Sequence, residues 1–502
     1  MDKKYFSKKF MHINNNYDFE LYVLFLLEIY SKYENIKIKP RYKDRDDKIH
    51  SEFDAIFPDG IKDLIGPSIL EIKLNGINYN LKKYKDKINN LYPKYKSMLL
   101  IVGSELKEND LKTIENYKKI LPKEFQLEVW DLNNIRDLLN SLINKDKNIL
   151  NSLNDETIYS NHLVNYGLRL RLDDEKEKKK KKKKESWKED NEFYIRQANQ
   201  HYNDDKLVFF LGAGVSIDAG LPNWDKLINR LNISFIDSKF EQRKKLNNNE
   251  KRTLAKLLSI HNGSTPLISA RYIKEGFGEQ FIGEVKSALY KNVKPLKDQK
   301  ILSTIAKCAH APRNKLGICS IITYNFDDLL ERHLKEENVR IKVIYREEDI
   351  PNDDSLPIYH VHGFLPDEST KYSDLDKSLF VFSEEAYHSL QQDCYSWSNL
   401  VQINALRENI AIFIGLSVSD PNLRRLLNIY GERSDECKHY VLLQRQFQNI
   451  EKDYDVREDL IEDFSIIHHT TQEEIFKRFG LNVIWYINHN EISEIIKQIT
   501  NI

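Results

Sequence analysis

The stretch LVFFLGAGVSIDAGLPNW, residues 207–224, decides the fold of the C-terminal part of the chain. It opens with a short apolar run bounded by glycine, which is typical of a buried strand in an α/β sheet. Gly212 and Gly214 then form a turn without side chains, where a helix is expected to begin. Such a turn lets backbone amides approach the pyrophosphate of a dinucleotide.

The glycine spacing excludes the common dehydrogenase fingerprint. That fingerprint places its third glycine three residues after the second, whereas the next glycine here is Gly220, six residues after Gly214. Ser216 and Asp218 follow the turn and offer further hydrogen bonds. A glycine turn alone is weak evidence for a dinucleotide site, because many such turns bind nothing.

Three later segments repeat the same pattern of an apolar strand that ends in polar residues. They are ICSIITYNFDDLL (318–330), IYHVHGFL (358–365) and IAIFIGLSVSDPNLRRLL (410–427). Ligands of open α/β sheets bind outside the carboxyl ends of the strands. The polar groups expected at these ends are Thr323, Asn325, Asp327, His362, Gly363, Gly415, Ser417 and Asp420.

In this order, GAGVS, TYNFD, VHG and GLSVSDPN resemble the sirtuin superfamily, and more closely its NAD hydrolases of bacterial antiviral defence. The resemblance runs from about Lys206 to the C-terminus. It includes FGLNVIWYINHNEISEIIKQI (479–499), which predicts a strand and an amphipathic helix. It implies a Rossmann-like parallel sheet, a small helical lobe over about 235–295, and NAD as substrate.

The resemblance also assigns roles to single residues. Asn325 and His362 match the catalytic asparagine and histidine, with His362 as general base. A neutral imidazole accepts a proton near physiological pH, and a carboxamide can orient a water and a ribose hydroxyl without any metal. The residues implied to contact NAD are Gly212, Ala213, Gly214 and Ser216 at the phosphates and nicotinamide ribose, Asp327, and Gly415, Ser417 and Asp420 at the adenosine side.

One departure from the protein deacylases of the superfamily favours water over an acylated peptide as the second substrate. Deacylases insert a four-cysteine zinc ribbon after the HG motif, but no cysteine lies between Gly363 and Leu379. Pro222, Asn223 and Trp224 also replace the usual Pro-Asp-Phe-Arg sequence. We therefore expect no zinc and no CxxC site. Four reduced thiols are expected instead: Cys308, Cys319, Cys394 and Cys437.

The N-terminal part contains a second candidate site in SEFDAIFPDGIKDLIGPSILEIKL, residues 51–74. Glu71 and Lys73 lie two apart on a predicted strand, so their side chains share a face, towards Asp54. This pattern resembles the PD-(D/E)xK fold of restriction endonucleases, although Phe53 replaces the expected proline. The resemblance implies Asp54 and Glu71 as Mg²⁺ ligands and Lys73 near the attacking water. A domain that binds nucleic acid without cutting it, and a docking scaffold, stay open as alternatives. We expect Glu20, on the first helix, to be solvated.

Composition and charge set the domain organisation. Residues 1–155 are assigned to the nuclease-like α/β domain, 156–190 to a charged linker with seven consecutive lysines at Lys178–Lys184, and 191–502 to the sirtuin-like domain. The 77 basic and 77 acidic residues cancel, so no overall field draws the chain to nucleic acid or membranes. LYVLFLLEIY (21–30) is too short to span a bilayer, so we expect a cytoplasmic protein.

The resemblance to the antiviral NAD hydrolases implies an anti-phage effector that depletes NAD and causes abortive infection, with the N-terminal domain cutting or sensing nucleic acid. An active NAD hydrolase would poison its own cell, so we expect an inactive homo-oligomer that awaits a nucleic acid or phage-derived trigger. Two alternatives remain: a nuclease whose sirtuin-like domain senses NAD or ADP-ribose, and a protein deacylase.

Overall fold

The chain divides into two compact units, one of residues 1–186, 431–437 and 451–480 and one of residues 187–430, 438–450 and 481–502. The run Lys178–Lys184, and the predicted linker up to residue 185, lie outside the described residues, so the three-part division stays a prediction. The computed structural model describes residues 16–46, 49–74, 84, 88–89, 91–145, 186–204, 206–240, 244–261, 266–309, 317–352, 354–431, 437–445 and 458–502.

The first unit contains a mixed sheet in the order β1-β2-β5-β6-β7. Strand β2 pairs antiparallel with both β1 and β5, whereas β5, β6 and β7 run parallel. A short hairpin of β3 and β4 follows β2. The strands are β1 (Lys39–Asp46), β2 (Ile49–Phe57), β3 (Gly60–Ile61), β4 (Leu64–Ile65), β5 (Ser68–Lys73), β6 (Ser97–Val102) and β7 (Gln126–Trp130).

Alternating side chains of this sheet build a core on each face. Leu70 and Ile72 of β5 pack with α2 (Asn16–Glu34) and α5 (Leu132–Lys145). Ile69 packs on the opposite face with α4 (Glu108–Lys118). Helix α18 (Glu458–Arg478) is counted with this unit, and Lys477 forms an ion pair with Glu52 of β2 at 3.6 Å. The sequence division into 1–155 and 191–502 does not anticipate this placement of α18.

The second unit contains a seven-stranded sheet in the order β10-β11-β9-β8-β12-β13-β14, and all its strand pairs are parallel. The predicted parallel α/β sheet is confirmed. Strand β8 is central, with β9 and β12 on its two sides. The strands are β8 (Leu207–Leu211), β9 (Ile318–Thr323), β10 (Ile341–Ile344), β11 (Leu356–His360), β12 (Ile410–Ile414), β13 (His439–Gln444) and β14 (Leu481–Tyr486).

In the sheet, β9 lies on one side of β8 and β12 on the other. In open α/β sheets, a ligand crevice forms at the carboxyl ends of two adjacent strands whose connections leave in opposite directions. Helix α14 (Leu329–Glu336) follows β9, α17 (Pro421–Gly431) follows β12, and α19 (Glu491–Thr500) follows β14, as the sequence predicts. Strand β11 ends at His360, two residues before His362, so the histidine lies in the loop after the strand.

A predicted helix directly after the glycine turn is only a 3₁₀ turn, η1 (Ala213–Ser216). Gly220 then has φ +93° and Pro222 follows, which prevents the helix from continuing. The first α-helix, α9, begins at Trp224.

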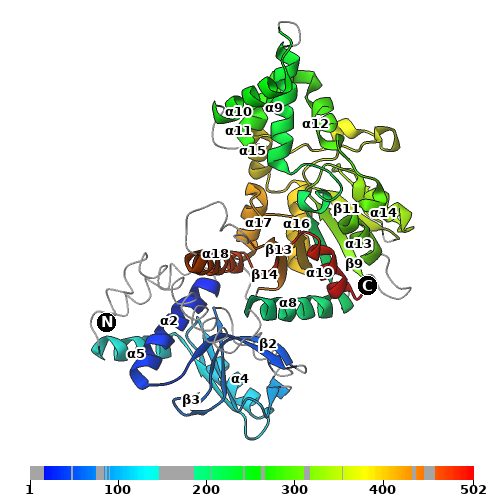
Figure 1. Ribbon diagram of the computed structural model, residues 1–502. Coiled ribbons are helices and arrows are strands. Elements are labelled where there is room, and N and C mark those ends of the chain that lie inside the picture. The colour runs from blue at the N-terminus through cyan, green and yellow to red at the C-terminus, as the bar shows by residue number, and fades with distance from the viewer. Residues whose placement is uncertain are drawn as a thin grey trace. The chain divides into compact units, whose positions relative to one another are not determined.

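The predicted helical lobe is present. Helices α10, α11 and α12 all pack against α9, and Figure 1 shows the four in green gathered at one end of the second unit. The unit also contains α8, α13, α15 and α16. Among the described residues, no helix is long and apolar enough to span a bilayer. The bounds are α8 (Ser186–Asn203), α9 (Trp224–Phe240), α10 (Asn248–His261), α11 (Pro266–Phe277), α12 (Phe281–Tyr290), α13 (Lys300–Cys308), α15 (Glu384–Gln392) and α16 (Trp397–Glu408).

Candidate active site

Two turns, one after β8 and one after β12, are clasped together by their backbones. The Gly212 amide donates to the carbonyl of Ile414 at 3.0 Å, and the Gly214 amide donates to that of Gly415 at 2.9 Å. A Cβ atom on Gly214 would lie 2.5 Å from Cα of Gly415, and Gly415 has φ +67°. The predicted glycines therefore stand where two strands' turns leave no room for a side chain.

Three predicted residues meet beside this turn. The Asn325 side-chain amide donates to Oγ of Ser216 at 3.2 Å, and Ser216 donates to Oδ2 of Asp327 at 3.2 Å. The hydroxyl oxygen of Thr323 accepts a hydrogen bond from the backbone amide of Asn325 at 3.1 Å, which fixes the backbone after β9. Residues more than a hundred positions apart in the chain thus form one polar chain of contacts at the strand ends.

Asp327 is buried within this cluster. Burial and the neighbouring carboxylate of Glu331 raise its pKa to about 7, while a hydrogen bond from the Leu329 amide opposes the rise. An aspartate that is partly protonated at neutral pH is unusual outside functional sites. Its ionised form is favoured by any cation that comes close.

His362 lies in a buried aromatic pocket. Its ring stands edge-on to Tyr324 at 4.4 Å between centroids, and Tyr387 lies 5.7 Å away. Its Nε2 atom is buried without a hydrogen-bond partner among the described residues, and it lies 3.7 Å from Oδ2 of Asp420. Burial lowers the pKa of His362 and Asp420 opposes the change. The imidazole is therefore neutral at physiological pH, as a general base must be.

Asp420 sits between His362 and the start of α17. It accepts hydrogen bonds from the Tyr387 hydroxyl at 2.5 Å and from the Leu423 amide at 2.7 Å. The carboxylate thus caps α17 and faces His362, and its assignment to the adenosine side stays a prediction. Ser417 is exposed and contacts Ser419, next to Val418 at φ +52°.

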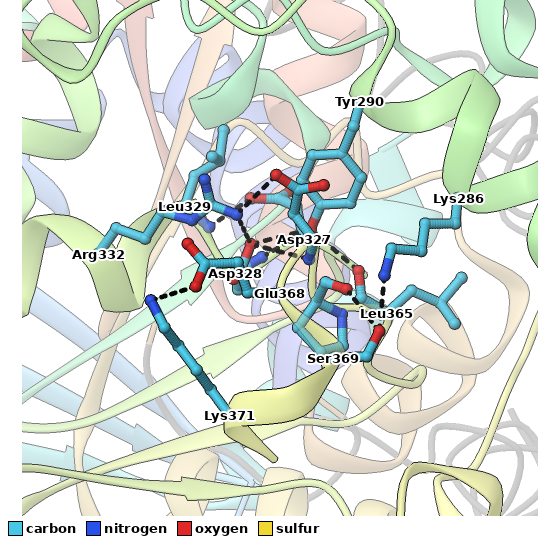
Figure 2. Close-up of polar contacts among 12 residues, drawn as sticks. Lys286, Tyr290, Asp327, Asp328, Leu329, Arg332, Leu365, Glu368, Ser369 and Lys371 are labelled. Carbon is cyan, nitrogen blue, oxygen red and sulfur yellow. Dashed lines mark hydrogen bonds and ion pairs between the residues drawn. The ribbon is translucent and has the colours of Figure 1, made fainter.

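A second polar network supports the loop that carries His362. Figure 2 shows Asp328 with Tyr290, Arg332 and Leu365 around it. The Tyr290 hydroxyl lies 3.0 Å from Oδ1 of Asp328 and 2.9 Å from the carbonyl oxygen of Leu365 and can donate its one proton to either, and Arg332 donates to Asp328 at 2.8 Å. Tyr290 ends α12, so the helical lobe is tied to the loop that follows the HG motif.

Some residues that sequence reasoning noted have structural partners instead. Asp218 accepts from the Ile301 amide at 3.1 Å and so caps α13. His360, set aside as structural, contacts Glu331 at 2.8 Å and the carbonyl of Asn325 at 3.0 Å. His360 therefore fixes the backbone of Asn325 through its carbonyl.

Sequence reasoning missed the two tyrosines around His362 and the histidine beneath the glycine turn. Tyr324 lies inside the TYNFD motif, so its place in the motif could have marked it. Tyr387 comes from α15 and carries no local signal. His489, which precedes α19, contacts the carbonyl of Gly214 at 2.7 Å, and only the fold brings it there.

The first unit brings together the other predicted triad. Lys73 Nζ lies 3.5 Å from Oδ2 of Asp54 and 3.3 Å from Oε2 of Glu71, and the Tyr84 hydroxyl donates to Glu71 at 2.9 Å. Burial strongly raises the pKa of Asp54; Lys73 lowers it, and the charges of Glu20 and Glu71 raise it further. Glu20, expected to be solvated, is half-buried and acts on Asp54.

Two carboxylates suit Mg²⁺, and the fit depends on their neighbours. Asp54 already accepts from the Ile72 amide at 2.6 Å, and the Lys73 ammonium lies near both carboxylates. The carboxylates of Asp54 and Glu71 supply oxygen donors, and their role as Mg²⁺ ligands stays a prediction. Among the described residues, no group of three or more His, Cys, Asp or Glu is arranged to hold a metal. None of the four cysteines, all in described segments, is in a disulfide.

The sheet order and the glycine turn define a Rossmann-like domain, with Ser216, Asn325 and Asp327 clustered at its strand ends. Residues 319–467 match the family model described as "SIR2-like domain". The chain is similar to proteins named NAD(+) hydrolase ThsA. The one from Enterococcus faecium is 24% identical over 318 residues, covering 62% of this chain and 58% of that protein.

The chain is also similar to two further proteins. NAD(+) hydrolase ThsA of Bacillus cereus (strain MSX-D12) is 24% identical over 330 residues, covering 62% of this chain and 57% of that protein. Defense-associated sirtuin 2 of Bacillus subtilis is 25% identical over 239 residues, covering 47% of this chain and 20% of that protein. The chain therefore spans less than two thirds of the length of each of these relatives.

Proposed function

We propose that this chain hydrolyses NAD to nicotinamide and ADP-ribose as an effector of anti-phage defence, so that NAD depletion arrests the infected cell in an abortive infection. The observation that carries the proposal is the contact of Ser216, Asn325 and Asp327 beside the clasped glycine turns. The names of the similar proteins, NAD(+) hydrolase and defense-associated sirtuin, support the substrate and the role.

We assign a separate role in the reaction to each of Asn325, His362 and Asp327. Water adds to the ribose carbon as its bond to nicotinamide breaks, and a proton is released. Asn325 would orient the water and a ribose hydroxyl, which contributes by positioning. His362, kept neutral by burial, would accept the proton. The ionised form of Asp327 would stabilise the cationic nicotinamide ring and the positive charge that develops on the sugar.

The test is nicotinamide release by the full chain, with Asn325→Ala and His362→Ala beside the wild type. His388, exposed on α15, gives a matched control in His388→Ala. Because we propose an inactive homo-oligomer that awaits a trigger, NAD is also measured in cells under phage challenge. NAD loss that persists in both catalytic variants would contradict the proposal, and peptide deacetylation by the wild type would favour the deacylase alternative.

A second activity has its own observation, the contact of Asp54, Glu71 and Lys73 in the first unit. We propose that this unit is nuclease-like and cuts or senses nucleic acid, with Mg²⁺ polarising the phosphate when bound. Cleavage of DNA or RNA that needs Mg²⁺ and is lost in Glu71→Gln supports cutting. Glu115→Gln, on the exposed face of α4, is the matched control.

Toxicity in cells separates the two effectors. If NAD hydrolysis is the effector, His362→Ala abolishes toxicity and Lys73→Ala leaves it. The reverse order would make the nuclease-like unit the effector and the sirtuin-like unit a sensor of NAD or ADP-ribose.

A further inference from the structure

A pocket of about 600 Å³ lies between α13 and α19, and none of the residues that line it is assigned to NAD. The two helices pack side by side, as Figure 1 shows, and Cys308 contacts Thr500 near their C-terminal ends at 3.2 Å. Lys300 and Glu491, the first residues of the two helices, both line the pocket. The positive ends of two helix dipoles therefore meet at one end of the cavity.

The pocket is rich in lysine. Its lining includes Lys297, Lys300, Lys307 and Lys497 against Glu491 and Glu494, a net side-chain charge of 4 − 2 = +2. Lys497 forms an ion pair with Glu494 at 2.8 Å. Glu491 accepts hydrogen bonds from the amides of Ile487 and Asn488.

The other lysines have no such neutralisation. Lys297, Lys300 and Lys307 are exposed, and none of them forms an ion pair within the described part of the chain. Lys300 and Lys307 lie seven residues apart on one face of α13. Unpaired ammonium groups around a concave surface attract anions.

An independent observation lies on the α19 wall. Ser493 lines the pocket and is 6% exposed, and its hydroxyl oxygen has no hydrogen-bond partner among the described residues. A buried hydroxyl without a partner costs free energy, so native structures usually supply one. A ligand oxygen that enters between the helices would supply it.

One wall of the pocket is hydrogen-bonded to the glycine turn and the other to Asp218, two residues after the turn ends at Ser216. On the α13 wall, the Ile301 amide donates to Asp218, five residues after Ala213. On the α19 wall, His489 contacts the carbonyl of Gly214, and its neighbours Asn488 and Asn490 line the pocket. An occupant that moves either wall therefore acts on the turn assigned to the NAD phosphates.

We propose that the pocket between α13 and α19 binds a small phosphorylated anion, and that its occupancy changes the affinity of the glycine turn for NAD. Phosphate oxygens match the unpaired ammonium groups and accept from the Ser493 hydroxyl. Coupling between two such sites is reciprocal, so NAD alters the affinity for the anion by the same factor. The coupling, but not the anion site, rests on the proposed NAD function.

Binding is tested by calorimetric titration of the full chain with inorganic pyrophosphate at physiological salt. Lys300→Gln/Lys307→Gln is expected to weaken binding about tenfold or more, since both ammonium groups face the anion. Lys245→Gln/Lys256→Gln, on exposed positions of the helical lobe, is the control with the same loss of charge. Ser493→Ala tests the hydroxyl without changing charge. Equal binding in the wild type and Lys300→Gln/Lys307→Gln, or no binding at millimolar pyrophosphate, would overturn the site.

Coupling is measured as NAD affinity with and without pyrophosphate, in the His362→Ala background so that NAD is not consumed. A change of about fivefold or more that disappears in Lys300→Gln/Lys307→Gln supports the coupling. An equal change in that variant would mean that pyrophosphate competes at the glycine turn, which overturns the coupling. If NAD does not bind at all, the proposed function fails, while the pyrophosphate titration still decides the anion site.

Discussion

Replacing Gly214 by alanine tests whether the clasped turns are the NAD phosphate site. An added Cβ would lie 2.5 Å from Cα of Gly415, where ordinary contact begins at 3.4 Å, so the turns must separate by 3.4 − 2.5 = 0.9 Å. That movement strains the hydrogen bond from the Gly214 amide to the Gly415 carbonyl, now 2.9 Å long. Overpacking costs about 1–3 kcal/mol and a lost hydrogen bond about 1 kcal/mol.

The expected loss is therefore about 2–4 kcal/mol in the free energy of unfolding of the second unit. In a unit of this size each kcal/mol lowers Tm by about 2–4 °C, which differential scanning calorimetry resolves. A displacement near 1 Å at a substrate-positioning turn also costs about a hundredfold in kcat/KM, followed by nicotinamide release.

Gly283→Ala is the matched control. Gly283 lies inside α12, and a Cβ there meets no atom within 4 Å. This variant is expected to gain about 0.5–1 kcal/mol from helix propensity and to keep wild-type kinetics. If Gly214→Ala binds NAD and unfolds like the wild type, the turn is not held as tightly as argued and its role at the phosphates is refuted.

Three further outcomes follow from buried groups. Because burial lowers the pKa of His362, the acid limb of kcat/KM should lie below pH 6.5 once the ionisation of Asp327 near pH 7 is removed by Asp327→Asn, and adding Asp420→Asn, which removes the carboxylate that raises the pKa of His362, should move the limb lower still; a limb that rises would contradict this. Asp327 ionises near 3.8 when unfolded and near 7 when folded, so stability should fall by about 4 kcal/mol as pH rises between these values, and Asp327→Asn should flatten the denaturation midpoints over that range. Tyr290→Phe removes the hydroxyl from Asp328, which keeps its bond from Arg332, and from the carbonyl of Leu365, and should cost about 1–3 kcal/mol in chemical denaturation, whereas Tyr272→Phe, at an exposed tyrosine, should cost almost nothing.

The sequence predicts the sheet of the second unit well because its strands are short apolar runs bounded by glycine or polar residues. Buried parallel strands have this composition, and the strands at 207–211, 318–323 and 410–414 end where the apolar runs end. The helix expected after Gly214 is the main error. Local pattern favours a helix there, but Gly220 at φ +93° and Pro222 shorten it to one 3₁₀ turn.

The site was predictable to the degree that its residues lie in motifs, and its chemistry depends on residues that do not. Asn325 and His362 follow strand ends, so sequence alone places them at one edge of a parallel sheet. Tyr387 and Asp420 reach His362 only because α15 and α17 both begin near it, and no sequence periodicity predicts that contact. Yet these neighbours, with burial, set the protonation of the imidazole, which decides whether it can act as a base. The motif therefore identifies the reacting group, while the tertiary fold sets its pKa and hence the pH range in which it can act as a base.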